Sequence, residues 1–130
     1  MFALDTNTLI YFFKGRGNVS DRLLETPPNQ ITIPSVVLFE IFVGLEKSES
    51  PAKRRKQLGD FLRVVTIQPF GPAEAQTAAI IRAHLEKQGQ PIGPLDTLIA
   101  ATALTHNAVL VTHNTSEFSR VPRLEVVDWY

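Results

Sequence analysis

The 130-residue chain contains no cysteine. Disulfide bonds, thiolate zinc sites, iron–sulfur clusters and cysteine nucleophiles are therefore all excluded. Because a chain without disulfides suits a reducing compartment, we expect a cytoplasmic protein.

The chain also lacks an excess of charge of either sign. Thirteen basic residues balance thirteen acidic ones, so no overall positive field draws the protein toward polyanions. Any contact with nucleic acid must therefore use a local basic patch.

Long apolar runs are missing as well. No stretch approaches the roughly 18 apolar residues of a membrane span. Asp5 stands where a signal peptide would carry its basic segment. We therefore expect a soluble, unprocessed protein that makes no contact with membranes.

Two families of glycine motif are absent too. The chain has neither the Walker nor the dinucleotide-binding pattern, which gives little support to a nucleotide cofactor. It also has no Gly-x-Ser-x-Gly elbow, so a serine hydrolase of that type is unsupported.

Short apolar segments alternate with longer segments of helical spacing. The short segments predict strands at 2–4, 31–33, 64–67 and 108–111, with a candidate fifth strand at 124–127. The longer segments predict helices at 9–13, 20–24, 36–45, 53–62, 72–88 and 95–105. This alternation and the length predict one α/β domain, residues 1–130, with a mainly parallel sheet covered on both faces.

Serines and apolar residues add detail to two of these helices. Ser20 and Ser35 are candidate N-caps for the second and third helices. The segment 36–45 is apolar on almost every face, apart from Glu40, which predicts a helix packed centrally.

Four polar residues stand where such a fold could carry chemistry. Asp5 and Asn114 come directly after, or close to, the end of a strand, and ligands of open parallel sheets bind beyond the carboxyl ends of the strands. Glu40 lies among apolar neighbours, and Asp96 lies in the first turn of the last long helix. Structural alternatives remain open: Asp5 as a turn residue, Glu40 as an exposed helix position, and Asp96 as an acid that complements the helix dipole.

Asp5, Glu40 and Asp96 would repel one another if they converged without matching basic residues. A cation among them would relieve that repulsion. Oxygen ligands favour Mg²⁺ or Mn²⁺, which can lower the pKa of bound water and stabilise charge on a phosphate. The residues therefore predict metal-assisted phosphodiester chemistry.

Four segments together resemble a known family. They are Leu4-Asp5-Thr6-Asn7, Glu40, Gly93-Pro94-Leu95-Asp96, and Val111-Thr112-His113-Asn114 followed by Glu117-Phe118. Their order and spacing resemble the PIN-domain ribonucleases, specifically the VapC-type toxins of toxin–antitoxin pairs. The similarity covers essentially the whole chain, and its specificity comes from the four segments in combination.

This resemblance implies a fold, an activity and partners. It implies a single PIN domain over 1–130 with a three-layer α/β/α fold, a divalent-metal-dependent endoribonuclease, and a homodimer that can enter a larger toxin–antitoxin assembly. A cognate VapB-type antitoxin would inhibit it. Asp5, Glu40 and Asp96 would be the catalytic, metal-binding core, with Mg²⁺ or Mn²⁺ as the cofactor. The sequences of residues 93–96 and 114–118 most resemble those of the tRNA-cutting members. The resemblance therefore implies the anticodon loop of initiator tRNA as the substrate.

The resemblance also places supporting residues near this core. They include Asn7, and Thr112, whose hydroxyl could hold a water. Many PIN domains have a fourth acid where this chain has Asn114, and an amide brings no charge, which puts a second metal in doubt. Glu117 either supplies the missing charge or only starts or caps the segment before Phe118. For Thr6 we expect local hydrogen bonds at the turn.

RNA contacts have two candidate locations. The basic run Lys53, Arg54, Arg55 and Lys56 could meet RNA phosphates, and the alternative is a solvated helix face. His113, at a strand end, could also touch RNA.

Other classes fit the sequence less well. A haloacid-dehalogenase-like phosphatase needs a second aspartate at position 7, where this chain has Asn7, and a receiver domain needs an aspartate near Gln68-Pro69. Neither class explains Glu40. A catalytically impaired PIN-like module that only binds RNA or protein remains as the alternative, because Asn114 replaces an acid.

Overall fold

The computed structural model describes all residues from Met1 to Tyr130. Five strands form one sheet in the order β3-β2-β1-β4-β5, and every neighbouring pair is parallel. The parallel sheet predicted from the sequence is therefore confirmed. The strands are β1 Phe2–Leu4, β2 Ile31–Pro34, β3 Thr66–Gln68, β4 Val109–Val111 and β5 Val126–Val127.

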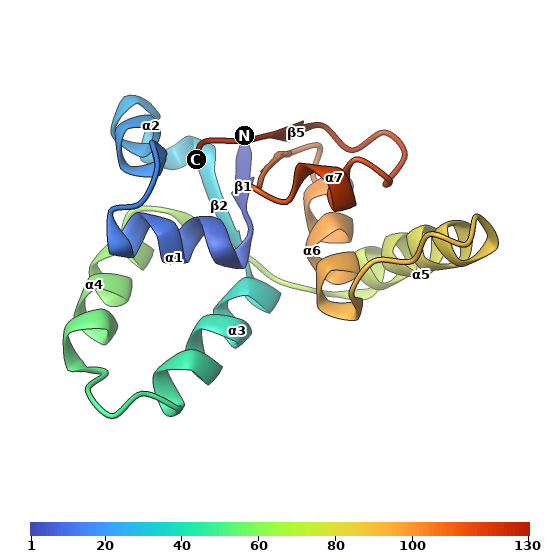
Figure 1. Ribbon diagram of the computed structural model, residues 1–130. Coiled ribbons are helices and arrows are strands. Elements are labelled where there is room, and N and C mark those ends of the chain that lie inside the picture. Colours follow the sequence, from blue (N-terminus) through green and yellow to red (C-terminus); the bar gives the residue numbers. More distant parts are fainter.

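Helices cover both faces of this sheet. Figure 1 shows α1, α2 and α4 gathered on one side of β1 and β2, with α5 and α6 on the other side. This arrangement confirms the predicted three-layer α/β/α fold. None of the helices combines the length and the apolar character that a membrane span requires. The helices are α1 Thr6–Lys14, α2 Val19–Glu25, α3 Ser35–Glu46, α4 Ala52–Leu62, α5 Pro72–Lys87, α6 Pro94–Thr105 and α7 Thr115–Phe118, with a 3-10 turn at Pro28–Gln30.

The central strand β1 fixes where a site can form. Ala3 and Leu4 are fully buried, because β2 and β4 pair with the two edges of β1 and helices cover both faces of the sheet. The strand order changes direction at β1, since β2 and β3 lie to one side of it and β4 and β5 to the other. Beyond the carboxyl ends of strands at such a point, parallel α/β sheets bind their ligands.

The predicted helix caps are wrong at two positions. Ser20 lies inside α2, which begins at Val19 and has Asn18 in the capping position. Ser35 is the first residue of α3, because β2 runs directly into the helix through Pro34. No linker separates strand from helix there, and so no side-chain cap forms.

The edge strands begin later than predicted. The amide of Val64 donates to the carbonyl of Phe61, so the last turn of the preceding helix extends over the residues expected to open β3. Likewise, the amide of Leu124 donates to the carbonyl of Val121 in a turn, and β5 starts only at Val126.

The composition of α3 predicts a centrally packed helix, and this prediction is wrong. Ile41 and Leu45 are buried, but Phe39 and Phe42 are 55% and 45% exposed. One face of the helix therefore packs against the domain, while an apolar face remains at the surface without a covering element of this chain.

Candidate active site

Asp5 is held at the junction of β1 and α1. It is the N-cap of α1, where its Oδ1 accepts a hydrogen bond from the amide of Thr8 at 2.9 Å. The hydroxyl of Thr8 donates to the carbonyl of Val111 at the end of β4, at 3.0 Å. Burial raises the pKa of Asp5, and hydrogen bonding by Thr112 and Thr8 offsets part of that rise. The side chain is thus both a helix cap and a buried carboxylate.

Glu40 reaches this junction from α3. The hydroxyl of Thr6 donates to its Oε1 at 2.6 Å, across 34 positions of sequence. The prediction that Thr6 makes only local hydrogen bonds is therefore wrong. Thr6 is the first residue of α1, next to Asp5, so its side chain starts at the same edge of the sheet, but nothing in the sequence identifies Glu40 as its partner.

Asp96 lies in the first turn of α6 and is half-buried. Its pKa is raised to about 6, chiefly by burial and then by repulsion from Glu117, Glu40 and Asp5 in that order. A helix dipole acting alone would lower the pKa of an acid at this position. Burial and the neighbouring carboxylates therefore outweigh the dipole, and the charges of the other two predicted acids act on Asp96.

Glu117 adds a fourth acid from α7. Its Oε1 accepts from the amide of Gly93 at 3.1 Å, and its Oε2 accepts a short hydrogen bond from the side-chain amide of Asn114. The carboxylate therefore joins α7 to the loop before α6. Both alternatives for Glu117 have support, because its charge contributes to the raised pKa of Asp96 and its side chain also lies in the first turn of α7.

The remaining supporting residues differ in their surroundings. Thr112 is fully buried, and its Oγ1 accepts from the backbone amide of Asn114 at 3.0 Å. Asn7 is exposed in the first turn of α1. The ring of His113 stacks on Tyr130 and bonds Asp128 through Nδ1 at 2.9 Å. These contacts hold the histidine against the carboxyl-terminal segment. Its ring makes no hydrogen bond to Asp5, Glu40, Asp96 or Glu117.

The predicted basic run divides into two pairs. Arg55 forms an ion pair with Glu46 at 3.1 Å, and Lys56 forms one with Asp60 at 3.3 Å. Lys53 and Arg54 instead line a cavity that also includes Glu40. Only half of the run thus adjoins the site.

Asp5, Glu40, Asp96 and Glu117 form what we call the acidic cluster. The basic side chains make five close contacts with carboxylates, three through lysine or arginine and two through histidine, and all five involve carboxylates outside the cluster. The cluster therefore has no cationic side chain to offset its charge, and its oxygen donors are those that Mg²⁺ and Mn²⁺ prefer.

The carboxylates of the cluster are spread rather than tightly grouped. No three of them are close enough together to enclose one ion as they stand. This spacing is compatible with Mg²⁺, which proteins usually bind through one or two carboxylates and several waters. By charge and by donor type, the residues present fit a divalent cation.

Comparisons with known proteins agree with this architecture. A family model described as the PIN domain matches residues 2–124. The chain is 34% identical over 128 residues to the tRNA(fMet)-specific endonuclease VapC of Shigella flexneri, with 98% of this chain and 97% of that protein covered. It is 35% identical to ribonuclease VapC2 of Haemophilus influenzae, with the same coverage.

Solved structures give the same result. The structure of VapBC2 from Rickettsia felis, bound to a DNA fragment from its promoter, matches with a TM-score of 0.92 and 34% identity, covering 99% of this chain and 98% of that one. The DNA-bound VapBC of Salmonella typhimurium matches with a TM-score of 0.92 and 32% identity, with the same coverage. The chain therefore belongs to the PIN-domain family and, within it, to the VapC-type proteins.

Proposed function

We propose that this chain is the toxin of a type II toxin–antitoxin pair, an endoribonuclease that hydrolyses RNA phosphodiesters in the cytoplasm with Mg²⁺ or Mn²⁺. The observation that carries the proposal is the acidic cluster, which lacks a cationic partner and includes Asp5 at the carboxyl end of β1, where its amide donates to Val111 at the end of β4. Relatives at 34–35% identity over nearly the full length are named endonuclease or ribonuclease, which supports the reaction class.

Asp5, Glu40 and Asp96 would hold the metal ion, partly by direct contact and partly through waters that the ion keeps. When bound, such an ion lowers the pKa of water and stabilises the charge that develops on the phosphate. The protein supplies carboxylates whose orientation is already fixed: the Thr8 amide holds Asp5, and the Thr6 hydroxyl holds Glu40. Fixed ligands avoid the cost of ordering side chains when substrate binds. Hydrolysis would leave a 5′-phosphate and a 3′-hydroxyl.

Glu117 supports this arrangement by position and charge. It holds the backbone of Gly93, three residues before Asp96, and it raises the pKa of Asp96 by repulsion. Asn114 cannot supply charge, but its side-chain amide orients Glu117. We therefore assign to Glu117 the negative charge that Asn114 lacks. We assign His113 no part in the proposed reaction, because Asp128 and Tyr130 hold its ring against the carboxyl-terminal segment.

Partners follow from the same relatives. Solved VapBC structures from Rickettsia felis and Salmonella typhimurium support a cognate VapB-type antitoxin as inhibitor. The exposed apolar face of α3, with Phe39 and Phe42, supports association with a further chain, and we include a homodimer in the proposal. Two relatives are named tRNA(fMet)-specific, so we propose initiator tRNA, cut in its anticodon loop, as the substrate.

The test is cleavage of total RNA by antitoxin-free protein in Mg²⁺ or Mn²⁺, with the new ends mapped. Asp5→Asn and Asp96→Asn are compared with the wild type after circular dichroism has confirmed that each is folded. We expect discrete cuts, including cuts in initiator tRNA, that a chelator and both substitutions abolish. A folded wild type that binds RNA but never cuts it would instead establish the catalytically impaired binding module.

A further inference from the structure

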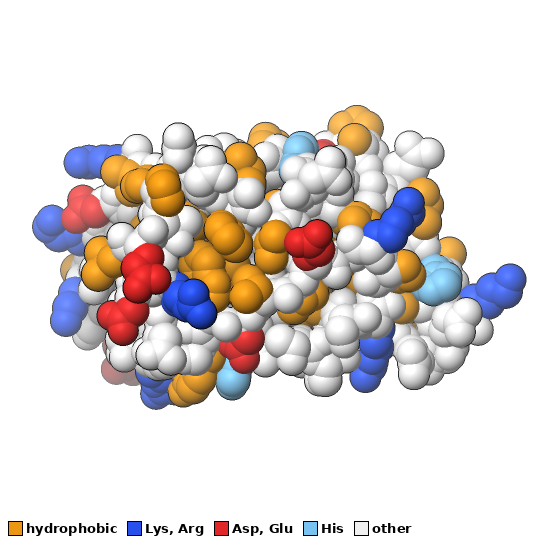
Figure 2. Space-filling view, turned by 90° about the horizontal axis from the view of Figure 1, so that it is seen from above, with side chains coloured by type: hydrophobic (Ala, Val, Ile, Leu, Met, Phe, Trp, Pro, Cys, Tyr) orange, Lys and Arg blue, Asp and Glu red, His pale blue; other side chains and the backbone are white.

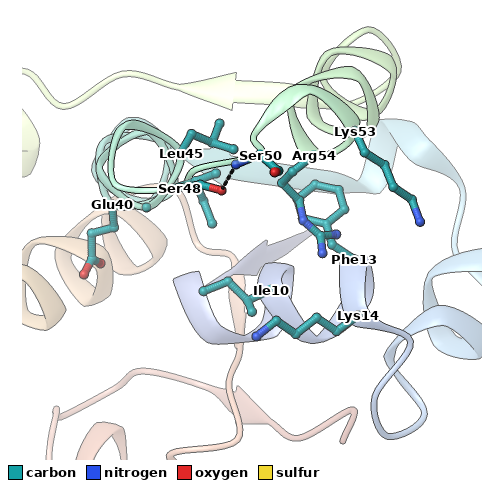
Figure 3. A pocket seen from close by; sticks show the side chains of 11 residues that line it. Ile10, Phe13, Lys14, Glu40, Leu45, Ser48, Ser50, Lys53 and Arg54 are labelled. Atoms are coloured by element: carbon teal, nitrogen blue, oxygen red, sulfur yellow. Dashed lines mark hydrogen bonds between the residues drawn. The ribbon is translucent and has the colours of Figure 1, made fainter.

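A cavity of about 470 Å³ opens beside the acidic cluster, between α1, α3 and α4. Its polar lining comprises Lys14, Glu40, Ser48, Ser50, Lys53 and Arg54. Figure 3 shows Glu40 at one end of this lining and Lys53 at the other, with Lys14 and Arg54 between them. Glu40 therefore belongs both to the acidic cluster and to the cavity.

The cavity is strongly cationic for a protein without net charge. Three of its side chains are basic and only Glu40 is acidic. None of the five ion pairs of the protein involves Lys14, Lys53 or Arg54. By contrast, the adjacent Arg55 and Lys56 are both paired. The unpaired half of the basic run is thus the half that faces the cavity.

Arg54 is held ready to bind a ligand. Its Cζ lies 5.0 Å from the centroid of the Phe13 ring, and its Nη1 donates to Oε1 of Gln57 at 2.8 Å. These contacts order the guanidinium but use only one of its five N–H donors. The remaining donors suit a phosphate, which guanidinium groups bind with two parallel hydrogen bonds.

The start of α4 adds to the positive potential. The 11-residue helix begins at Ala52 with no side-chain cap and no acid in its first turn. Lys53 and Arg54 occupy that turn, although the positive end of the helix dipole disfavours cations there. A bound anion would satisfy the uncapped amides and relieve this repulsion.

We propose that this cavity binds backbone phosphates of the RNA strand next to the bond that is cut, through Lys14, Lys53 and Arg54. The inference rests on the proposed nuclease function. It assigns to the cavity the phosphates of the substrate that lie outside the acidic cluster. Through Glu40, the cavity continues directly from the cluster. A strand whose scissile phosphate lies at the cluster therefore has neighbouring phosphates within reach of the three cations. RNA is favoured as the occupant because three of the lining side chains are cations that form no ion pair, although Ile10, Phe13, Ile41 and Leu45 add apolar surface to the same lining.

The test uses a matched pair of double variants on one helix. Lys53→Gln with Arg54→Gln removes two cations that line the cavity, while Arg55→Gln with Lys56→Gln removes two that form ion pairs outside it. The probe is a short fluorescein-labelled single-stranded RNA, and its affinity for each folded protein is measured by anisotropy over a series of salt concentrations, with no divalent metal present.

We expect the cavity variant to bind RNA about tenfold more weakly and the control variant to bind like the wild type. Each lost phosphate contact lowers the slope of log affinity against log salt by about 0.7 for single strands, so the cavity variant should lose about 1.4. Lys14→Gln, which leaves the contact between Arg54 and Phe13 intact, should lose about 0.7 and guards against a folding artefact.

Several results would overturn the proposal. Equal affinities and slopes for the two double variants would show that the cavity does not bind the RNA backbone. If the cavity variant bound RNA normally but lost affinity for the cognate antitoxin, the cavity would belong to the protein partner. These binding measurements are independent of cleavage. If the cavity variant bound and cut RNA as well as the wild type does, this inference would be wrong, while the nuclease proposal would stand.

Discussion

At the scale of single residues, the acidic cluster shows how burial and repulsion act together. Asp5 is 5% exposed, yet hydrogen bonds from Thr8 and Thr112 stabilise its charged form. No hydrogen bond offsets the effect of burial at Asp96, so burial and three neighbouring carboxylates raise its pKa to about 6. Without metal, the ionised form of Asp96 therefore opposes folding.

The substitution Asp96→Asn should stabilise the metal-free protein above pH 6. The folded-state pKa lies above the ordinary value of 3.8, so folding becomes less favourable as pH rises from about 4 through 6 and Asp96 ionises. Asparagine cannot ionise and escapes this loss. Thermal unfolding in a chelator should show a higher Tm for the variant at pH 8 and equal values near pH 4. A variant that melts below the wild type at pH 8 would show that the repulsion is not significant.

Thr6 is a positioning residue that the sequence did not reveal. Replacing it with valine keeps the shape but removes the hydroxyl that donates to Glu40. Hydrogen bonds to metal ligands typically contribute 10–100-fold to affinity or activity, so Thr6→Val should weaken Mn²⁺ binding by about tenfold. Thr66→Val, at an exposed position of β3, is the matched control and should change nothing. Calorimetric titration of Mn²⁺ checks both, and an unchanged affinity in Thr6→Val would contradict the role.

At the scale of elements, much of the fold follows from sequence and the rest depends on contacts between distant segments. The strand–helix alternation and the buried strands are readable because apolar runs of different length have different periods. The first residues of β3 and β5 cannot be predicted from the sequence. Val64 and Leu124 have strand-like side chains but form turns. The exposed face of α3 cannot be predicted for a similar reason. The sequence shows that its residues are apolar but not which of them other parts of this chain cover.

The same limit applies to the candidate site. Glu40 stands out as an acid among apolar neighbours, whereas Asp5 after a strand and Asp96 in a first turn are ordinary alone and are singled out by the resemblance of the four segments together. Thr6, Thr8 and Lys14 do not, because their roles depend on partners that only the folded chain brings near. The division of the basic run is likewise invisible in sequence, where Lys53 and Arg55 look equivalent.

Helix α4 allows a test of whether the cations in its first turn lower the stability of the protein while they strengthen RNA binding. Lys53→Glu places an acid near the positive end of the helix, where it should stabilise the protein by about 0.3–1 kcal/mol. The same change should weaken RNA binding more than Lys53→Gln does, since it adds repulsion to the loss of a cation. Urea unfolding and RNA anisotropy measure the two effects, and a variant that is both less stable and normal in RNA binding would refute this description of the helix.

At the scale of the whole molecule, zero net charge conceals a local separation of charges. Figure 2 shows one face on which acidic and basic side chains are interspersed, so no broad field of one sign covers it. The acidic cluster and the cationic cavity instead adjoin at Glu40. A polyanion would be attracted by the cavity and repelled by the cluster until a divalent cation neutralises the latter.

The central claim is that the acidic cluster is a metal-dependent hydrolytic centre. Its most direct test is a calorimetric titration of Mn²⁺ into antitoxin-free wild type and Asp5→Asn, followed by an assay of initiator tRNA cleavage on the same samples. We predict that the wild type binds Mn²⁺ and cuts only once it is bound, and that folded Asp5→Asn does neither. Cleavage by wild type in excess chelator, or equal Mn²⁺ binding and cleavage by Asp5→Asn, would contradict the account.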